Sequence, residues 1–236
     1  MTTSHESAHA YFGGMAESYD SLIRRAVPRY AEMTERLLTY LPSDSKRVLE
    51  MGCGTGNLSL ALVERFPNST LTLVDASEEM IALTRERVEA RFREVTPAVS
   101  YVVSRFEDLE FPAGSFDLVT SSISLHHVRD KALLYERIRE LLADGGRFCF
   151  ADQMRGEPES NHLVNWEQWL AFCRQSGNCT ADELAGLVDH AEAHDHYTPV
   201  SEHFSMLSRA GFGEIDCVWR NWMWGIITAT AAQELN

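Results

Sequence analysis

Short apolar segments alternate with helical segments along most of the chain, and this alternation constrains the fold more than any other feature. A sheet whose successive strands are joined by helices is parallel and carries helices on both faces. We therefore predict a doubly wound α/β fold. The five strands predicted from the alternation are Arg47 to Met51, Thr70 to Asp75, Val99 to Val103, Phe116 to Ser122 and Arg147 to Asp152.

Residues that begin and end helices mark the segments between these strands. Asn57 to Phe66 is predicted to be one helix, stopped by the Pro-Asn pair that follows it. Ser77 can accept a hydrogen bond at the beginning of a second helix. Asp130 begins a third helix, which we expect to end at the glycine pair of residues 145–146.

The alternation stops between Met154 and Pro199, where the pattern is helical and no strand is predicted. We interpret residues 155–199 as an insertion over the edge of the sheet that acts as a lid. Residues 1–45 are predicted to be a helical cap that precedes the sheet, and residues 46–236 form the core. The chain is then expected to close with a helix, Ser201 to Ala210, and two strands, Glu214 to Trp219 and Met223 to Thr228.

Composition limits the partners of the chain. Its formal net charge is -14, whereas binding to a phosphate backbone relies on lysine and arginine. We therefore expect no nucleic-acid partner and no anionic membrane surface. Five cysteines without a C-x-x-C pair indicate reduced thiols, and the first residues lack the pattern of a secretory signal. Both features predict a cytoplasmic location.

A glycine turn follows the first predicted strand in the stretch VLEMGCGTGNLSL. Glu50, Gly52, Gly54 and Gly56 form an E-x-G-x-G-x-G pattern, which lacks the G-x-G-x-x-G spacing of a dinucleotide site. Asp75 ends the second strand, nineteen residues after Gly56. A carboxylate there can accept hydrogen bonds from ribose hydroxyls. The turn and Asp75 together predict a nucleoside ligand without a pyrophosphate.

Six segments resemble class I S-adenosylmethionine-dependent methyltransferases of the small-molecule type, in order and spacing. They are VLEMGCGTG, LTLVDAS, FEDLEF, SFDLVTSSISLHHV, LLADGGRFCFAD and RAGF. The resemblance implies a Rossmann-like sheet of seven strands with the last strand antiparallel. It also implies S-adenosyl-L-methionine as cofactor and S-adenosyl-L-homocysteine as product.

The resemblance further assigns residues to parts of the cofactor. The three glycines and Cys53 would admit its methionine portion, Glu50 would steady the turn, and Asp75 would bind the ribose. The segment YFGGMAESYD resembles one that folds over the cofactor, so that Tyr19 would cover the methionine end and Arg24 or Arg25 would meet its carboxylate. The remaining residues implied at the cofactor are Ala76 and Met80 beside the adenine, with Arg105, Phe106 and Ser121.

One position departs from the family pattern. Members of this type usually have an acidic residue after the third strand to receive the adenine amino group, and Arg105 stands there instead. Three alternatives stay open: a backbone carbonyl replaces it, Glu107 replaces it, or the adenine packs on Phe106.

Candidate catalytic residues lie where the fourth and fifth strands end. Methyl transfer needs an aligned nucleophile, and it needs a general base only if the acceptor must lose a proton. His126, His127 and Asp152 are the candidates for that base, since a histidine titrates in the useful range. In the alternative interpretation the histidine pair only caps the strand.

The acceptor is expected to meet aromatic residues. Trp166 and Trp169 share one helical face of the insertion with Phe172, and Tyr11 and Phe12 lie in the N-terminal segment. This stripe can close over an apolar acceptor, or it can be the ordinary packing face of the helix.

Three histidines in the stretch DHAEAHDHY, His190, His194 and His196, invite a metal interpretation. Such acidic, histidine-bearing stretches are usually solvated, and no cysteine joins them. We predict no metal site.

These observations predict a methyltransferase that acts on an oxygen or nitrogen atom of a small molecule, and whether two copies form a homodimer stays open. Three alternatives also stay open. The first is an enzyme that uses the same cofactor without transferring its methyl group, the second is a protein or tRNA methyltransferase, and the third is a non-enzymatic module that only binds the cofactor.

Overall fold

The computed structural model describes residues 16–92 and 98–232. One sheet runs through the molecule in the order β3-β2-β1-β4-β5-β8-β7, and β6 pairs with β5 beside it. The strands are β1 (Arg47–Met51), β2 (Thr70–Asp75), β3 (Ala98–Val103), β4 (Phe116–Ser122), β5 (Leu142–Arg155), β6 (Thr198–Pro199), β7 (Phe212–Asn221) and β8 (Trp224–Ala231).

The strands β3, β2, β1, β4 and β5 are parallel to one another, and β8 runs antiparallel to both β5 and β7. The predicted fold is thus confirmed, including its antiparallel last strand. The helices of the described ranges are α2 (Ala16–Ala26), α3 (Tyr30–Tyr40), α4 (Asn57–Arg65), α5 (Glu78–Arg91), α6 (Lys131–Leu141), α7 (Glu159–Cys173), α8 (Ala181–His194) and α9 (Val200–Arg209), with short 3-10 turns η1 (Phe106–Asp108) and η2 (Leu125–His127).

Two details of the prediction were wrong. The insertion contains the short strand β6, which pairs in parallel with the end of β5. The strand β5 begins at Leu142, where pairing with Phe116 of β4 extends it beyond the predicted Arg147. The helix α6 consequently ends at Leu141 and does not reach the glycine pair. Both differences arise from strand pairing, which depends on residues distant in the sequence.

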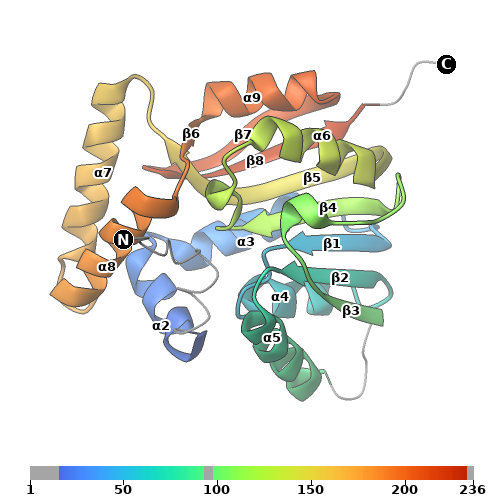
Figure 1. Ribbon diagram of the computed structural model, residues 1–236, viewed down its shortest axis with the longest axis horizontal. Coiled ribbons are helices and arrows are strands. Elements are labelled where there is room, and N and C mark those ends of the chain that lie inside the picture. Colours follow the sequence, from blue (N-terminus) through green and yellow to red (C-terminus); the bar gives the residue numbers. More distant parts are fainter. Residues whose placement is uncertain (1–15, 93–97, 233–236) are drawn as a thin grey trace, which may run out of the picture.

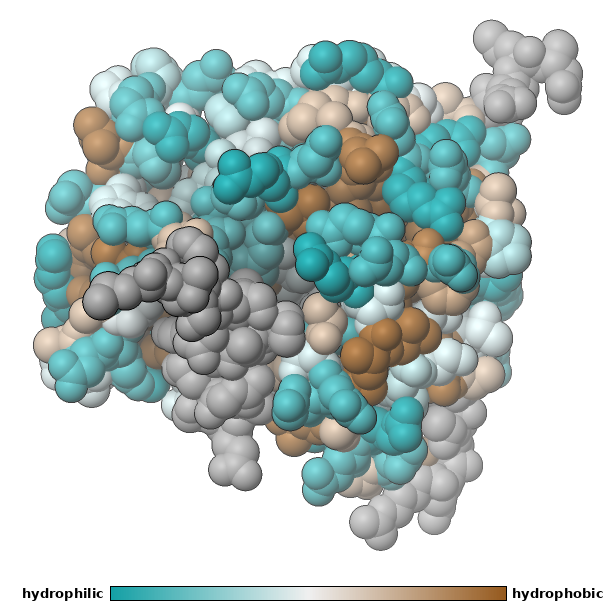
Figure 2. Space-filling view, viewed as in Figure 1, coloured by the Kyte–Doolittle hydropathy of each residue, from teal (hydrophilic) through white to brown (hydrophobic). Residues whose placement is uncertain are grey.

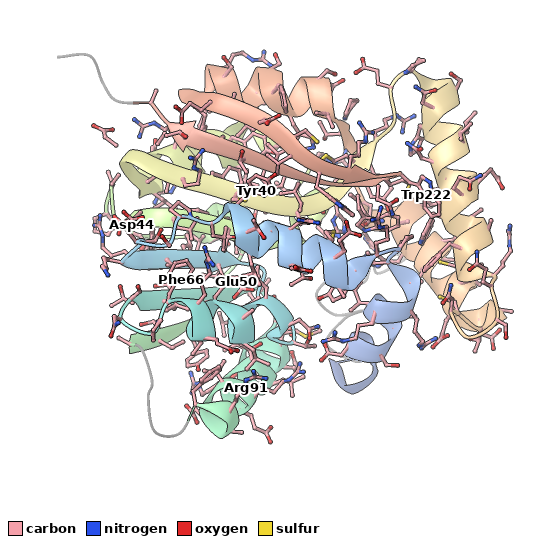
Figure 3. All side chains as sticks on the ribbon, turned by 180° about the vertical axis from the view of Figure 1, so that it is seen from behind. Tyr40, Asp44, Glu50, Phe66, Arg91 and Trp222 are labelled. Atoms are coloured by element: carbon pink, nitrogen blue, oxygen red, sulfur yellow. The ribbon has the colours of Figure 1, made fainter. Side chains whose placement is uncertain are left out.

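The sheet separates two hydrophobic cores because successive side chains of a strand point to opposite faces. Leu118 and Cys149 belong to the core beneath α2, α3, α4 and α5, whereas Val119 and Phe148 belong to the core beneath α6 and α9. Figure 1 shows α6 and α9 on one side of the sheet, and Figure 3, from behind, shows α3 and α4 on the other. This is the arrangement of helices on both faces that the alternation predicted.

The insertion lies beyond the carboxyl ends of the central strands, where α7 and α8 stand beside α2 (Figure 1). Trp169 of α7 donates a hydrogen bond from Nε1 to the carbonyl oxygen of Ala26, at 3.0 Å. Arg25 of α2 forms an ion pair with Glu183 of α8, at 2.7 Å. These contacts join the N-terminal helices to the insertion at the end of the sheet where ligands of α/β proteins bind.

Within the described ranges, every helix is too short or too polar to cross a bilayer. Figure 2 shows hydrophilic side chains over most of the visible face, with hydrophobic ones in small separate groups. Scattered apolar residues of this kind are ordinary for a protein surface.

Candidate active site

A cavity of about 890 Å³ opens at the carboxyl ends of the first four strands. Its walls come from the loops that follow β1, β2, β3 and β4, from α2 and α3, and from the end of α8. A cavity of this size is typical of a small-molecule or cofactor site. The alternation of strands and helices explains its position, because it brings the loops after parallel strands to one end of the sheet.

The three glycines of the turn have different surroundings, although all have a positive φ, at 72°, 52° and 87°. A Cβ atom added to Gly52 would lie 1.9 Å from Ser124 Oγ, and one added to Gly56 would lie 3.0 Å from Thr84 Oγ1. A Cβ on Gly54 would meet no described heavy atom within 4 Å. Gly52 and Gly56 therefore permit close packing, and Gly54 alone leaves its space to the cavity.

The Asp75 carboxylate holds the turn. Its Oδ2 atom accepts a hydrogen bond from the Gly54 amide at 2.8 Å, and its Oδ1 atom accepts one from the Ser77 amide at 3.0 Å. Asp75 also lines the cavity. A carboxylate oxygen has two lone pairs, so Asp75 can hold the turn and accept further hydrogen bonds from a ligand.

Glu50 is a buried acid in the wall of the cavity. Figure 3 labels it near the carboxyl end of β1. Ser59 Oγ donates a hydrogen bond to its Oε2 atom at 2.6 Å. Burial raises the pKa of Glu50 to about 8, and the Asp75 charge acts in the same direction, against the Ser59 hydrogen bond. A cation in the cavity would stabilise the charged form of Glu50 and lower this pKa.

The predicted adenine end is lined by Ala76, Met80, Arg105, Phe106 and Glu107. Met80 is buried, whereas the Arg105 side chain is 70% exposed and lies 3.6 Å from a Glu107 carboxylate oxygen. Phe106 and Glu107 both face the cavity, so two of the three alternatives for the adenine have their residues in place.

The helix α2 is fastened to the glycine turn through Asp20, which the sequence argument missed. Asp20 accepts hydrogen bonds from Thr55 Oγ1 and from Asn57 Nδ2, the latter at 2.8 Å. It also forms an ion pair with Arg87 of α5, at 2.6 Å. Only the position of Asp20 in the covering segment YFGGMAESYD hinted at this role.

The two arginines of α2 point to different partners. Arg24 does not line the cavity itself, but it donates a hydrogen bond at 3.0 Å to Oδ1 of Asn57, which does. Arg25 is directed to Glu183 and does not line the cavity, so its predicted contact with the cofactor carboxylate does not fit this geometry. Tyr11 and Phe12 lie outside the described residues, as does the side chain of Tyr19.

Two further predicted cofactor residues differ in their placement. Cys53 is buried in the cavity wall, and burial raises the pKa of its thiol. Ser121 does not line the cavity, because it is buried and donates a hydrogen bond to the Met51 carbonyl oxygen at 2.7 Å. Its neighbour Ser122 lines the cavity instead. The alternation of side chains along β4 decides which of the two serines faces the ligand.

A second cavity of about 60 Å³ adjoins the first, and His127 lines both. His126, Trp169 and Asp195 also line the smaller cavity. Trp169 is buried and packs edge-on against Trp166, with ring centroids 4.8 Å apart, whereas Trp166 lines neither cavity. Trp169 thus lies both in the packing face of α7 and in the wall of a cavity.

The predicted catalytic residues lie together with a residue that the sequence argument overlooked, Asp195. His126 Nδ1 lies 2.5 Å from Asp152 Oδ1, and His127 Nδ1 lies 3.0 Å from Asp195 Oδ1. Burial opposes a charge on His126, yet the two carboxylates raise its pKa. Burial and the neighbouring His126 lower the pKa of His127. The stretch DHAEAHDHY contained the signal for Asp195, but the sequence did not indicate its partners.

Comparisons with known proteins agree with this geometry. The model of a methyltransferase domain family matches residues 48–146, from β1 into the first residues of β5. The ubiquinone/menaquinone biosynthesis C-methyltransferase UbiE of Xanthomonas campestris pv. campestris is 33% identical over 230 residues, which cover 92% of this chain and 85% of the relative.

Other relatives match over a shorter region. Malonyl-[acyl-carrier protein] O-methyltransferase 1 of Ilyobacter polytropus is 28% identical over 59% of this chain and 49% of its own length. The trans-aconitate 2-methyltransferase of an Acidovorax strain is 36% identical over 66% of this chain and 57% of its own length. The chain therefore spans about half the length of these two relatives.

Among solved structures, a chain of the complex between the Haloferax volcanii Trm112 methyltransferase activator and a methyltransferase has a similar fold. Its TM-score is 0.69 at 18% identity, and the match covers 94% of this chain and 98% of that chain. The resemblance noted in the six sequence segments is confirmed by a relative that aligns over nearly the whole chain. The chain belongs to the class I S-adenosylmethionine-dependent methyltransferases.

Proposed function

We propose that the chain transfers the methyl group of S-adenosylmethionine to an oxygen or nitrogen atom of a small molecule. The observation that carries this proposal is that two neighbouring cavities share His127 in their walls. The larger one has the glycine turn and Asp75 at its base, and the smaller one is enclosed by apolar and aromatic side chains. Methyl transfer needs this arrangement, because donor and acceptor must meet in line with water excluded.

In the larger cavity, the open space above Gly54 accommodates the methionine portion of the cofactor. The Asp75 carboxylate accepts hydrogen bonds from the ribose hydroxyls, and the adenine lies between Met80 and Phe106. Glu50 supports this assignment, because a buried acid in the wall is stabilised by a ligand that carries positive charge. Arg24, held at Asn57 beside the cavity, is then the arginine that meets the cofactor carboxylate.

The smaller cavity receives the reactive end of the acceptor. Ile23 and Ile123 line both cavities, and Trp169, Leu187 and Trp224 line the smaller one. This lining suits an apolar or aromatic group. The volume of about 60 Å³ accommodates only a small part of an acceptor, whose remainder would occupy the larger cavity. Such confinement favours a small molecule over a nucleic acid or a protein.

His127 contacts the acceptor in this proposal, because it lines both cavities. His126 lies against it, with ring centroids 4.0 Å apart, and Asp152 orients His126. The sulfonium charge of the cofactor disappears as the methyl group is transferred, so alignment contributes more than charge stabilisation.

The test is a screen of metabolite extracts with isotopically labelled S-adenosylmethionine, combined with calorimetry of the purified protein. We expect S-adenosylmethionine and S-adenosylhomocysteine to bind at one site, NAD to bind weakly, and the label to appear in a small molecule. Tight NAD binding without response to the other two would refute the cofactor assignment. Binding without S-adenosylhomocysteine formation in any extract would refute the enzymatic proposal.

Carbon is the second candidate for the methylated atom. The observation that favours it is the 33% identity, over 92% of this chain, with a relative named as a C-methyltransferase. Carbon-13 spectroscopy of the labelled product distinguishes the candidates, because a methyl carbon bonded to oxygen, nitrogen or carbon resonates in a different region.

A further inference from the structure

Three side chains from two segments, η2 and the loop after α8, place metal-binding atoms close together beside the smaller cavity. His126 Nε2 and His127 Nδ1 lie 3.7 and 3.0 Å from Asp195 Oδ1, and one ligand atom from each of the three residues lies within 4.8 Å of the other two. We infer that His126, His127 and Asp195 bind a divalent transition-metal ion such as Zn²⁺. From the sequence, we considered His190, His194 and His196 as metal ligands and predicted no metal site.

The distances agree with this inference. Zinc binds histidine nitrogen at about 2.0–2.1 Å and carboxylate oxygen at about 2.0–2.2 Å in tetrahedral geometry, so two ligand atoms of one ion lie about 3.3–3.5 Å apart. The separations of 3.0 and 3.7 Å lie on either side of this value. The His127 side chain is 23% exposed, so its ring has room to adjust to a bound ion.

Hydrogen bonds around the cluster orient the ligand atoms. Asp152 Oδ1 lies 2.5 Å from His126 Nδ1, which places a proton on Nδ1 and leaves the Nε2 lone pair facing Asp195. Tyr197 donates a hydrogen bond to Asp195 Oδ2 at 2.7 Å, so that Oδ1 is the oxygen turned to the histidines. A carboxylate that receives the outer proton of a histidine is the usual second contact of a metal-binding histidine.

Buried carboxylates flank the cluster. The side chains of Asp152 and Asp195 are both buried, and Lys131 interacts with both of them. Lys131 Nζ is held by the carbonyl oxygens of Val128 and His196, at 2.8 and 2.5 Å. A bound metal ion would add positive charge beside these two carboxylates.

His126 Nε2 lies 3.7 Å from Asp195 Oδ1, which is too long for a hydrogen bond and close to the separation of two ligand atoms on one metal ion. His190 supplies one more nitrogen on the same side, with Nε2 also 3.7 Å from Asp195 Oδ1.

The ion would lie at the wall of the acceptor cavity. Three protein ligands and an open position are typical of a catalytic zinc site, and two histidines with one carboxylate also suit other transition metals. The role of the ion rests on the proposed function: it would bind an oxygen atom of the acceptor and hold it in line with the methyl group. Binding of the ion itself does not depend on that role.

The test uses the full chain, freed of metal with a chelator and titrated with ZnCl₂ by calorimetry without cofactor. We expect one equivalent of Zn²⁺ to bind, and CoCl₂ to give visible absorption of a four- or five-coordinate site. His127→Ala and Asp195→Asn should each weaken Zn²⁺ binding at least tenfold, and Asp152→Asn by about 10- to 100-fold. His194→Ala is the matched control, because it removes a nearby histidine outside the cluster and should bind Zn²⁺ like the wild type.

The inference is overturned if the wild type binds no Zn²⁺, or if His127→Ala binds it as tightly as the wild type. Because the His127 side chain is 23% exposed, this variant is expected to fold even where Asp195→Asn does not. Circular dichroism and calorimetry with S-adenosylhomocysteine verify folding. Zinc binding without methyl transfer would count against the proposed function alone, and methyl transfer by a protein that binds no metal would count against the metal site alone.

Discussion

Replacement of Gly54 by alanine separates the role of the glycine turn in binding from its role in folding. Gly54 has a φ of 52° and leaves open space where a Cβ would stand, on the cavity side. Gly145 is a matched control, with a φ of 74° and the same open space, but on the exposed surface away from the cavity. A left-handed backbone costs a non-glycine residue about 1–2 kcal/mol. Both variants should therefore lose about that much stability.

Only Gly54→Ala should lose affinity for the cofactor. The added methyl group occupies space that the ligand needs, and forcing an extra carbon into a packed site costs about 1–3 kcal/mol. This corresponds to a loss of roughly 5- to 150-fold in affinity. Gly54→Val adds two more carbons at the same point and should abolish binding.

Calorimetry with S-adenosylhomocysteine and urea denaturation of the same preparations measure the two effects separately. The reasoning predicts equal stability losses in Gly54→Ala and Gly145→Ala and a loss of affinity in Gly54→Ala only. If Gly54→Ala binds within twofold of the wild type, the turn serves only the packing of β1 against α4, and the cofactor lies elsewhere.

Three further outcomes test the site. Asp75→Ala should weaken S-adenosylhomocysteine binding at least tenfold, since each hydrogen bond to a charged group contributes about 1.5–3 kcal/mol. If calorimetry finds unchanged affinity in the folded variant, Asp75 does not bind the ribose. The pKa of Glu50 is about 4.5 in the unfolded chain and about 8 in the folded one, so the unliganded wild type should lose stability as pH rises from about 5 to 8, by about 3–4 kcal/mol. Glu50→Gln should lack this loss. If the urea midpoints of the two proteins change equally between pH 5 and pH 8, the raised pKa of Glu50 is contradicted. Trp169→Phe keeps an aromatic core residue but loses the hydrogen bond to Ala26, and it should raise the acceptor KM with cofactor affinity nearly unchanged; an unaltered KM in steady-state kinetics would remove Trp169 from the acceptor wall.

The sequence by itself determined the elements and the base of the cofactor site, because their signals are local. A buried strand must be apolar, and Ser77 and Asp130 mark helix starts by accepting backbone hydrogen bonds within three residues. The three glycines of the turn have a positive φ, which glycine adopts without strain, so the residue type itself marks the turn in the sequence. The position of Asp75 followed from the length of one helix and one strand, and the resemblance of six segments extended these local signals to a family.

Tertiary structure alone decided which residues face one another. Gly52 and Gly54 look alike in the sequence, yet Ser124 and Phe106, from the loops after β4 and β3, restrict Gly52, and no described atom restricts Gly54. Arg25 is turned from the cavity by Glu183, which lies 158 residues away. His126 and Asp195 meet only because the insertion closes over the strand ends. The physical reason is that charge interactions, burial and packing depend on distances in space. For residues on different elements, those distances are set only when the sheet and its helices assemble.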